Sequence, residues 1–78
     1  MKIRYTLHAL ERMKQRGIDK ELVEECLENP DRTLLEEDTY KCIKKINDRV
    51  LVVIYRKNAD SILIITAFVS TKTHKYLG

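Results

Sequence analysis

The sequence predicts an α+β fold, in which two N-terminal helices pack on one face of a three- to four-stranded antiparallel sheet. Before Pro30, apolar residues recur with the 3.6-residue period of helices. After Pro30, β-branched and aromatic residues form short runs separated by turn residues, as in strands. The 78 residues suit one small domain, expected over residues 1–78, with a flexible basic tail from about residue 70.

The first predicted helix contains the segment His8–Gly17. Thr6 is a suitable N-cap, and Gly17 provides the left-handed residue that commonly ends a helix. The expected apolar stripe consists of Leu7, Ala9, Leu10 and Met13. Three basic residues spaced by four form a row beside it: His8, Arg12 and Arg16. Because a buried face does not favour such residues, this basic row is the first indication of a functional surface.

A second helix is predicted from Lys20 to about Glu28, with Asp19 as its N-cap and Asn29-Pro30 as its end. Its apolar face consists of Leu22, Val23, Cys26 and Leu27, and glutamates cover the other face. We therefore expect Cys26 to be a small core residue. The two cysteines of the chain show no metal or redox spacing, which predicts a reduced, cytoplasmic setting.

The predicted strands are residues 32–36, 40–46, 50–55 and 62–69, with turns at Glu37-Asp38 and Asn47-Asp48. Residues 1–5 are either a short strand or an arm. Along residues 49–56 successive side chains point to opposite faces of the sheet. We expect the residues at alternate positions from Val50 onward to face the helices. In the last strand the residues that face the helices stay undetermined, and the final residues show no usable period.

Charge is distributed unevenly along this mildly basic chain, whose net charge is +3. Residues 19–38 contain nine acidic and two basic residues, so this stretch is not expected to bind a phosphate backbone. A helix–turn–helix function is discounted for the same reason, because the second helix is acidic. The sequence shows no metal-ligand spacing, no phosphate-binding glycine loop and no apolar run of membrane-spanning length, and it predicts no cofactor.

The strands provide a candidate RNA surface. Its cations are Lys41, Lys44, Lys45, Arg49 and Arg56, with Tyr40, Tyr55 and Thr66 nearby in the predicted sheet. Lysine and arginine bind phosphate, and tyrosine stacks on bases. The alternative for the lysines is protection of sheet edges against aggregation, and for Thr66 simple β-propensity. Similarly, His8 is either a general acid or base or an ordinary surface histidine.

The pattern His8-x-x-x-Arg12-Met13-x-x-Arg16-Gly17-Ile18, a second helix ending Asn29-Pro30, and Thr66-Ala67-Phe68 in the last strand together resemble a widespread prokaryotic domain. That domain is grouped with the RelE/ParE/BrnT-like toxins. The resemblance implies a RelE-like fold and a metal-independent endoribonuclease neutralised by an antitoxin. The implied catalytic residues are His8, Arg12, Arg16 and Thr66. The candidate RNA- and phosphate-binding residues are Lys44, Lys45, Arg49, Arg56 and Tyr55.

The resulting hypothesis is a toxin-type domain that binds RNA, with ribosome-bound mRNA among the candidates, and cleaves it. A ribose 2′-hydroxyl would attack the adjacent phosphate with His8 as base or acid, and the cations would hold the phosphate. The alternative is a non-catalytic module that binds a partner protein, such as an antitoxin, through its sheet face or an edge strand.

Overall fold

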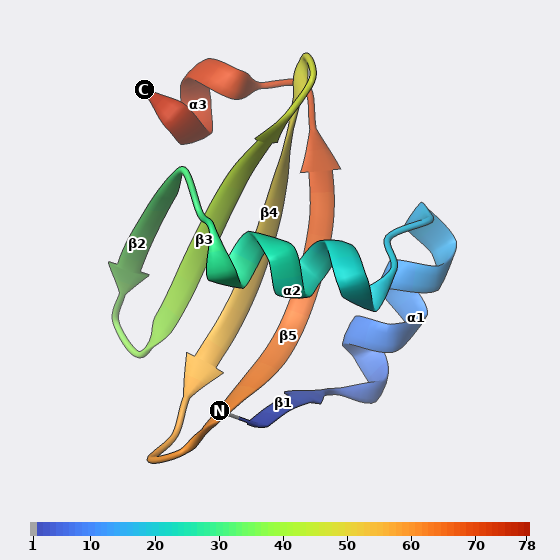
Figure 1. Ribbon diagram of the computed structural model, residues 1–78, viewed down its shortest axis with the longest axis vertical. Helices are drawn as coiled ribbons and strands as arrows, with labels where there is room; N and C mark the ends of the chain where they lie inside the picture. The colour runs from blue at the N-terminus through green and yellow to red at the C-terminus, as the bar shows by residue number, and fades with distance from the viewer. Residues whose placement is uncertain (1) are drawn as a thin grey trace.

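The structure is a computed structural model that describes residues 2–78 (Figure 1). Its helices are α1 (Leu7–Arg16), α2 (Lys20–Glu28) and α3 (Thr73–Leu77). Its strands are β1 (Lys2–Tyr5), β2 (Arg32–Glu36), β3 (Thr39–Ile46), β4 (Arg49–Lys57) and β5 (Ser61–Ser70). In these residues no helix is both long enough and apolar enough to cross a membrane.

The ends of the first two helices lie where the sequence predicts them. The Thr6 side chain accepts a hydrogen bond from the Ala9 amide, and Gly17 has a φ of 67°. The Asp19 side chain accepts a hydrogen bond from the Leu22 amide and so begins α2. These caps satisfy backbone groups that would otherwise have no partner at the helix ends. Predictions for α1 and α2 are therefore confirmed at both N-termini.

The sheet has five strands in the order β1-β5-β4-β3-β2. β1 runs parallel to β5, whereas the other pairs are antiparallel. The α+β class is confirmed, but the expected purely antiparallel sheet of three or four strands is wrong. β1 has four residues, too few to show a period, and its partner is nearly sixty residues away in the chain, so the sequence does not reveal the parallel pairing.

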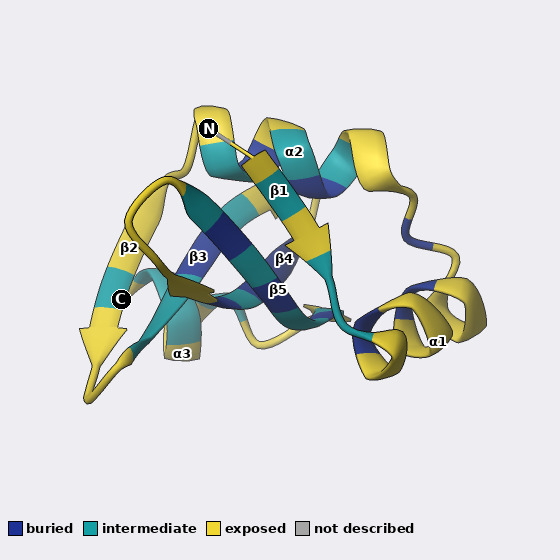
Figure 2. Ribbon diagram, turned by 90° about the horizontal axis from the view of Figure 1, so that it is seen from below, coloured by how far each residue is buried: buried dark blue, intermediate teal, exposed yellow. Residues whose placement is uncertain are grey.

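α1 lies beside β5, beyond the end of β1 (Figures 1 and 2). Thr6 begins the contact, because its amide and its hydroxyl donate to the Ile64 and Ile65 carbonyls. At the other end of the helix, Arg16 Nη1 donates to the Ala67 carbonyl over 2.9 Å. The helix therefore protects the part of the β5 edge that β1 leaves unpaired.

Two apolar clusters lie on the two faces of the sheet. Ala9 and Met13 of α1 and Val23 and Cys26 of α2 are buried in the first cluster, and strands contribute residues such as Leu51 to it. We call this side the α2 face. The second cluster is on the opposite side, which we call the α3 face because Tyr76 and Leu77 of α3 pack there; its buried members are Ile43, Val50 and Val52.

Two predictions about buried faces need correction. The set that begins with Val50 faces α3, and the alternate residues of β4, Leu51, Val53 and Tyr55, face α1 and α2. Both sets are buried because both faces of the sheet are covered. Apolar residues therefore occupy both faces of β4, and the sequence does not show which set faces which helix. In α1, Leu7 is 73% and Leu10 38% exposed, so the buried stripe is narrower than predicted.

The open question about β5 is resolved by a bulge. Tyr55 pairs with Ile64, but its neighbour Ile54 pairs with Thr66, so Ile65 is an extra residue in β5. The bulge changes the phase of the alternation. As a result Ile64 and Ala67 both belong to the α2-face cluster.

The chain ends in a short helix where the sequence predicts an irregular tail. α3 has five residues, which is too short for a visible helical period. It packs on β3 and β4, and Figure 2 shows it on the side of the sheet opposite α2. Arg32 of the edge strand β2 fixes its end, because Arg32 Nη1 donates to the Tyr76 carbonyl over 3.1 Å.

Candidate functional site

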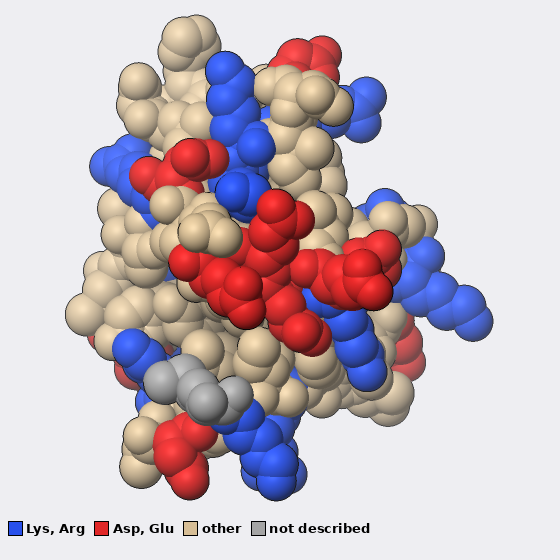
Figure 3. Space-filling view, in the orientation of Figure 1, with Lys and Arg blue, Asp and Glu red and all other residues tan. Residues whose placement is uncertain are grey.

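The α2 face is acidic. The outer side of α2 carries Glu21, Glu24, Glu25 and Glu28. In the space-filling view red side chains gather over this helix (Figure 3). Glu24 is also engaged locally, since it accepts a hydrogen bond from the Tyr5 hydroxyl over 3.3 Å. A polyanion is therefore repelled from the outer side of α2, while Lys44, Arg49 and Lys57 lie elsewhere on the same face.

The α3 face is basic where α3 does not cover it. Strand register places Arg4, Leu63 and Arg56 in one row across β1, β5 and β4. The adjacent row contains Thr66, Ile54 and Lys41, across β5, β4 and β3. Arg4 and Arg56 are exposed, while Thr66 and Lys41 are half-buried. We call the six residues of these two rows the basic rows: Arg4, Leu63, Arg56, Thr66, Ile54 and Lys41.

Two cations of the basic rows, Lys41 and Arg56, have loosely held acidic partners. Lys41 Nζ lies 3.0 Å from Glu36 Oε1, and Arg56 Nη2 lies 3.9 Å from Asp38 Oδ2. The Glu36 and Asp38 side chains are 60% and 74% exposed. Exposed ion pairs of this kind contribute at most about 1 kcal/mol. A phosphate can therefore replace these carboxylates at little cost.

An aromatic pair borders the basic rows. The rings of Phe68 and Tyr76 meet edge to face, with centroids 6.0 Å apart. Lys41 Nζ lies 6.0 Å and Lys75 Nζ 5.4 Å from the centroid of the Tyr76 ring. Tyr76 is half-buried, so part of the side chain stays accessible beside two cations. Aromatic rings next to cations are typical of surfaces that contact single-stranded nucleic acid.

The geometry of α1 directs the first two members of the basic row toward the α3 side. Met13 points into the α2-face cluster, and Arg16 points to the β5 edge. With 100° per residue around the helix axis, the Arg16 side chain points 60° away from the Met13 side chain. Arg12 lies a further 40° in the same sense, and His8 another 40° beyond Arg12. His8 and Arg12 therefore project on the flank away from α2, and both are exposed.

The structure brings together only part of the residue set predicted from the sequence. On the α3 side lie Thr66, Lys45 and Arg56, with His8 and Arg12 on the adjacent flank of α1. Arg16 is instead committed to the Ala67 carbonyl. We therefore assign Arg16 a positioning role at the β5 edge.

The remaining predicted residues lie on the acidic side. Lys44 pairs with Leu51 and Arg49 with Ile46, both on the α2 face, and Lys44 Nζ donates to the Asn29 carbonyl over 3.0 Å. Tyr55 is 8% exposed and stacks on Tyr40, with ring centroids 5.2 Å apart. Burial raises the pKa of Tyr55, and the ring is not available to stack on a base. The expectation that the sheet presents Tyr55 on an open face is wrong, because its alternation was assigned to the wrong side.

Several residues of this surface were missed by the sequence analysis. They are Lys2 and Arg4 of β1 and Arg32 of β2; Lys75 and Tyr76, which the sequence places in an irregular tail, join them from α3. The only available signal was the alternation of Lys2 and Arg4 with Ile3 and Tyr5, which is typical of a strand with one buried side. Which surface they join depends on the pairing of β1 with β5.

The candidate site is an open surface. Residues 2–78 form no enclosed pocket, and among these residues no group of three or more His, Cys, Asp or Glu side chains is placed to hold a metal ion. A flat surface with dispersed cations suits an extended ligand that makes many contacts rather than a small molecule enclosed in a cavity.

Comparison with known proteins gives one match. A family model described as a domain of unknown function, DUF4258, matches residues 5–69. This range extends from the end of β1 to β5 and excludes α3. No curated protein and no solved structure matches the chain.

Proposed function

The chain belongs to the DUF4258 family, and we propose that it is a toxin-type domain, similar to the RelE and BrnT toxins, that binds RNA on its α3 face and cleaves it without a metal ion. Such a domain would act in the cytoplasm of a prokaryotic cell under the control of an antitoxin. The observation that carries the RNA-binding part is the separation of charge between the two faces of the sheet.

The separation of charge favours one orientation for a polyanion. The glutamates of α2 repel phosphates from one side, while Arg4, Lys41 and Arg56 attract them on the other. Phe68 and Tyr76 add rings on which a base can stack. The small net charge of +3 hides this arrangement, because it averages the two faces.

The proposed cleavage uses groups from the flank of α1. His8 removes the proton of a ribose 2′-hydroxyl, whose oxygen attacks the adjacent phosphorus and expels the 5′-oxygen of the next nucleotide, which takes a proton from water. The products carry a 2′,3′-cyclic phosphate and a 5′-hydroxyl. Arg12, four residues along the same helix face, stabilises the charge that develops on the phosphate oxygens. Thr66 donates a hydrogen bond to the same phosphate from β5.

RNA binding can be tested by fluorescence anisotropy with a labelled single-stranded RNA. The double variant Arg4→Glu/Arg56→Glu should weaken binding by more than about tenfold and reduce the dependence of affinity on salt concentration, because two phosphate contacts become repulsive. The matched control is Arg49→Glu/Lys57→Glu, which reverses two exposed cations on the α2 face. Equal losses in the two proteins would contradict a preferred RNA face.

Cleavage needs a separate readout. The wild type is incubated with RNA in the presence of EDTA, and the products are examined for 2′,3′-cyclic phosphate ends. We expect His8→Ala and Arg12→Ala to bind RNA within a few-fold of the wild type but to lose cleavage by about 100-fold, a usual loss when an acid–base group or a donor to the developing charge is removed. If RNA binds but stays intact with the wild type, the catalytic part fails and the binding part stands.

The alternative function is partner binding through the free edge of β2. This strand is paired only with β3 and exposes 61% of Leu35, an arrangement that suits addition of a strand from an antitoxin. The test is co-purification with the protein encoded beside this gene. Loss of the complex with Leu35→Lys, and its retention with Arg56→Glu, would favour this function, and the opposite result would exclude the β2 edge.

A further inference from the structure

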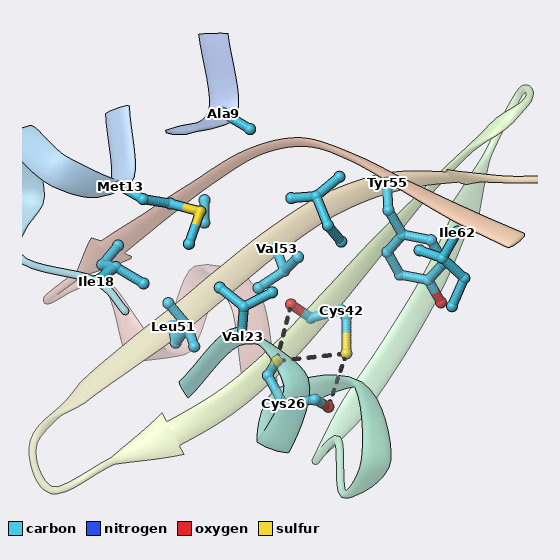
Figure 4. Packing of buried hydrophobic residues seen from close by; sticks show 12 residues of the cluster. Ala9, Met13, Ile18, Val23, Cys26, Cys42, Leu51, Val53, Tyr55 and Ile62 are labelled. Carbon is cyan, nitrogen blue, oxygen red and sulfur yellow. Dashed lines mark hydrogen bonds between the residues drawn. The ribbon is translucent and has the colours of Figure 1, made fainter. Parts of the chain in front are cut away.

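Two thiols meet in the core between α2 and β3. Cys26 Sγ lies 3.4 Å from Cys42 Sγ, and both side chains are free and buried (Figure 4). They are the two cysteines of the chain. The sequence predicts Cys26 to be a small core residue. Its place in the core is confirmed, but packing alone does not require the second sulfur to be its neighbour.

The backbone around the two sulfurs holds them in this contact. Cys42 Sγ donates to the Cys26 carbonyl over 3.1 Å, and Cys26 Sγ lies 3.7 Å from the Cys42 carbonyl. Each residue therefore contacts the other through its sulfur and its carbonyl. Because one comes from a helix and the other from the sheet, a covalent bond between the sulfurs would join two layers of the fold.

We propose that Cys26 and Cys42 form a reversible intramolecular disulfide when the chain meets a peroxide. The Cys42 thiolate attacks one peroxide oxygen, which forms a sulfenic acid and releases water after protonation. Cys26 Sγ then attacks Cys42 Sγ, and the sulfenic oxygen leaves as a second water. Two thiols thus lose two protons and two electrons, and one hydrogen peroxide is reduced to two waters.

The geometry requires little movement for this reaction. The sulfurs must approach from 3.4 Å to the bond length of about 2.05 Å, which side-chain rotation and a small shift of α2 can supply. Burial excludes solvent from both thiols, so oxidation is limited by how often α2 opens to admit the peroxide. Slow, gated oxidation distinguishes this pair from exposed catalytic thiols.

The electrostatics of the pair indicate which sulfur reacts first. The hydrogen bond from the Cys26 thiol lowers the pKa of Cys42, and the nearby Lys44 acts in the same direction. The pKa of Cys26 is raised, mainly by its contact with Cys42 and by burial. Cys42 is therefore the first thiolate to form, and Cys26 is the resolving thiol.

The test compares oxidised and reduced forms of the full-length wild-type chain. After treatment with hydrogen peroxide, we expect the intact mass to fall by that of two hydrogens, and no thiol to react with a thiol reagent in denaturant. The Tm should rise by about 10 °C, because the bond closes a loop between residues 26 and 42 in the unfolded chain. Dithiothreitol should reverse both changes.

Variants identify the order of reaction. In Cys26→Ala the sulfenic acid at Cys42 has no resolving thiol and should be trapped by a sulfenic-acid reagent, whereas Cys42→Ala should give little adduct. The comparison of oxidised and reduced wild type uses no variant, so it tests the proposal even if a cysteine variant folds poorly. Retention of both free thiols after an exposure to hydrogen peroxide long enough for the amides of α2 to exchange completely with solvent would overturn it, as would a disulfide between chains.

Discussion

Arg16 is the member of the basic row with a structural partner, and this makes its removal predictable. Its guanidinium donates to the Ala67 carbonyl at the β5 edge. We expect Arg16→Ala to lower the free energy of unfolding by about 1–2 kcal/mol, because a partly buried carbonyl loses a charged donor. Arg12→Ala, one turn earlier and exposed, should change it by less than about 0.5 kcal/mol. Urea unfolding of both variants measures the difference, and equal losses would contradict the positioning role of Arg16.

Tyr5 gives the structure a dependence on alkaline pH. Burial, the charge of Glu24 and the hydrogen bond to Glu24 raise the pKa of Tyr5 from 10.0 to about 12. Between these values the unfolded chain has lost the phenolic proton and the folded chain keeps it. The stability that this group contributes is therefore complete below pH 10 and is lost as pH rises through 12.

The measurement is urea unfolding of the wild type and Tyr5→Phe between pH 9 and pH 12, a range that brackets the two pKa values. Because phenylalanine does not titrate, the difference between the two proteins isolates Tyr5 from the lysines. We expect the wild type to lose stability with pH more steeply than the variant. Parallel slopes would show that the Tyr5 hydroxyl keeps its ordinary pKa.

At the scale of elements, two of the hairpin turns place different residue types in the same left-handed backbone conformation. Glu37, between β2 and β3, has a φ of 57°, and Asn47, between β3 and β4, has a φ of 56°. Asparagine tolerates this left-handed region, whereas glutamate has no such preference. We expect Glu37→Asn to stabilise the fold by about 0.5–1 kcal/mol and Asn47→Glu to destabilise it by a similar amount.

Thermal or urea unfolding of the two single variants and of the swapped double variant tests this expectation. The turns lie at opposite ends of β3, so the two effects should add in the double variant and nearly cancel. As a control, Asp48→Asn changes a neighbouring turn residue and should have a small effect. If Glu37→Asn destabilises the protein, the side chain of Glu37 contributes more than its backbone strain costs.

The same elements show what the sequence can and cannot predict. Helix ends were predictable because Thr6, Gly17 and Asp19 act on backbone groups a few residues away. Four antiparallel strands were also predictable, since hairpin turns connect neighbours in the chain. β1 and α3 are short and depend on distant partners, namely β5 for one and the second apolar cluster for the other. Local pattern carries no information about such partners.

The candidate site was predicted in part for a related reason. His8, Arg12 and Thr66 were identified by residue type and motif; the packing of α1 sets the direction of His8 and Arg12, and the register of β5 with β4 sets the face of Thr66. Lys44 and Tyr55 were grouped with the wrong neighbours because β4 is apolar on both faces. A strand that is covered on both sides shows no alternation of polar and apolar residues. Without that alternation in β4, the sequence does not show which face each paired residue of β3 occupies.

At the scale of the whole molecule, the lysines provide a map of the two faces. Lys2, Lys41, Lys45 and Lys75 lie on the α3 side, on β1, β3 and α3. Lys20, Lys44 and Lys57 lie on the α2 side; Lys20 belongs to α2, and Lys57 Nζ lies 5.6 Å from the ring centroid of Tyr40. Each molecule therefore contains its own reference set for a footprinting experiment.

We predict that bound RNA protects the first set of lysines from acetylation and leaves the second set reactive. Phosphates within reach of a cation exclude the reagent and hold the amine in its protonated, unreactive form, whereas the acidic α2 face keeps RNA away from the other set. Peptide mass spectrometry would compare acetylation rates with and without RNA, at low salt and again at high salt. High salt should abolish the difference, because RNA dissociates as counterions compete for its phosphates. Uniform protection of both sets, or protection of Lys20 and Lys44 alone, would show that charge separation does not orient RNA on this protein.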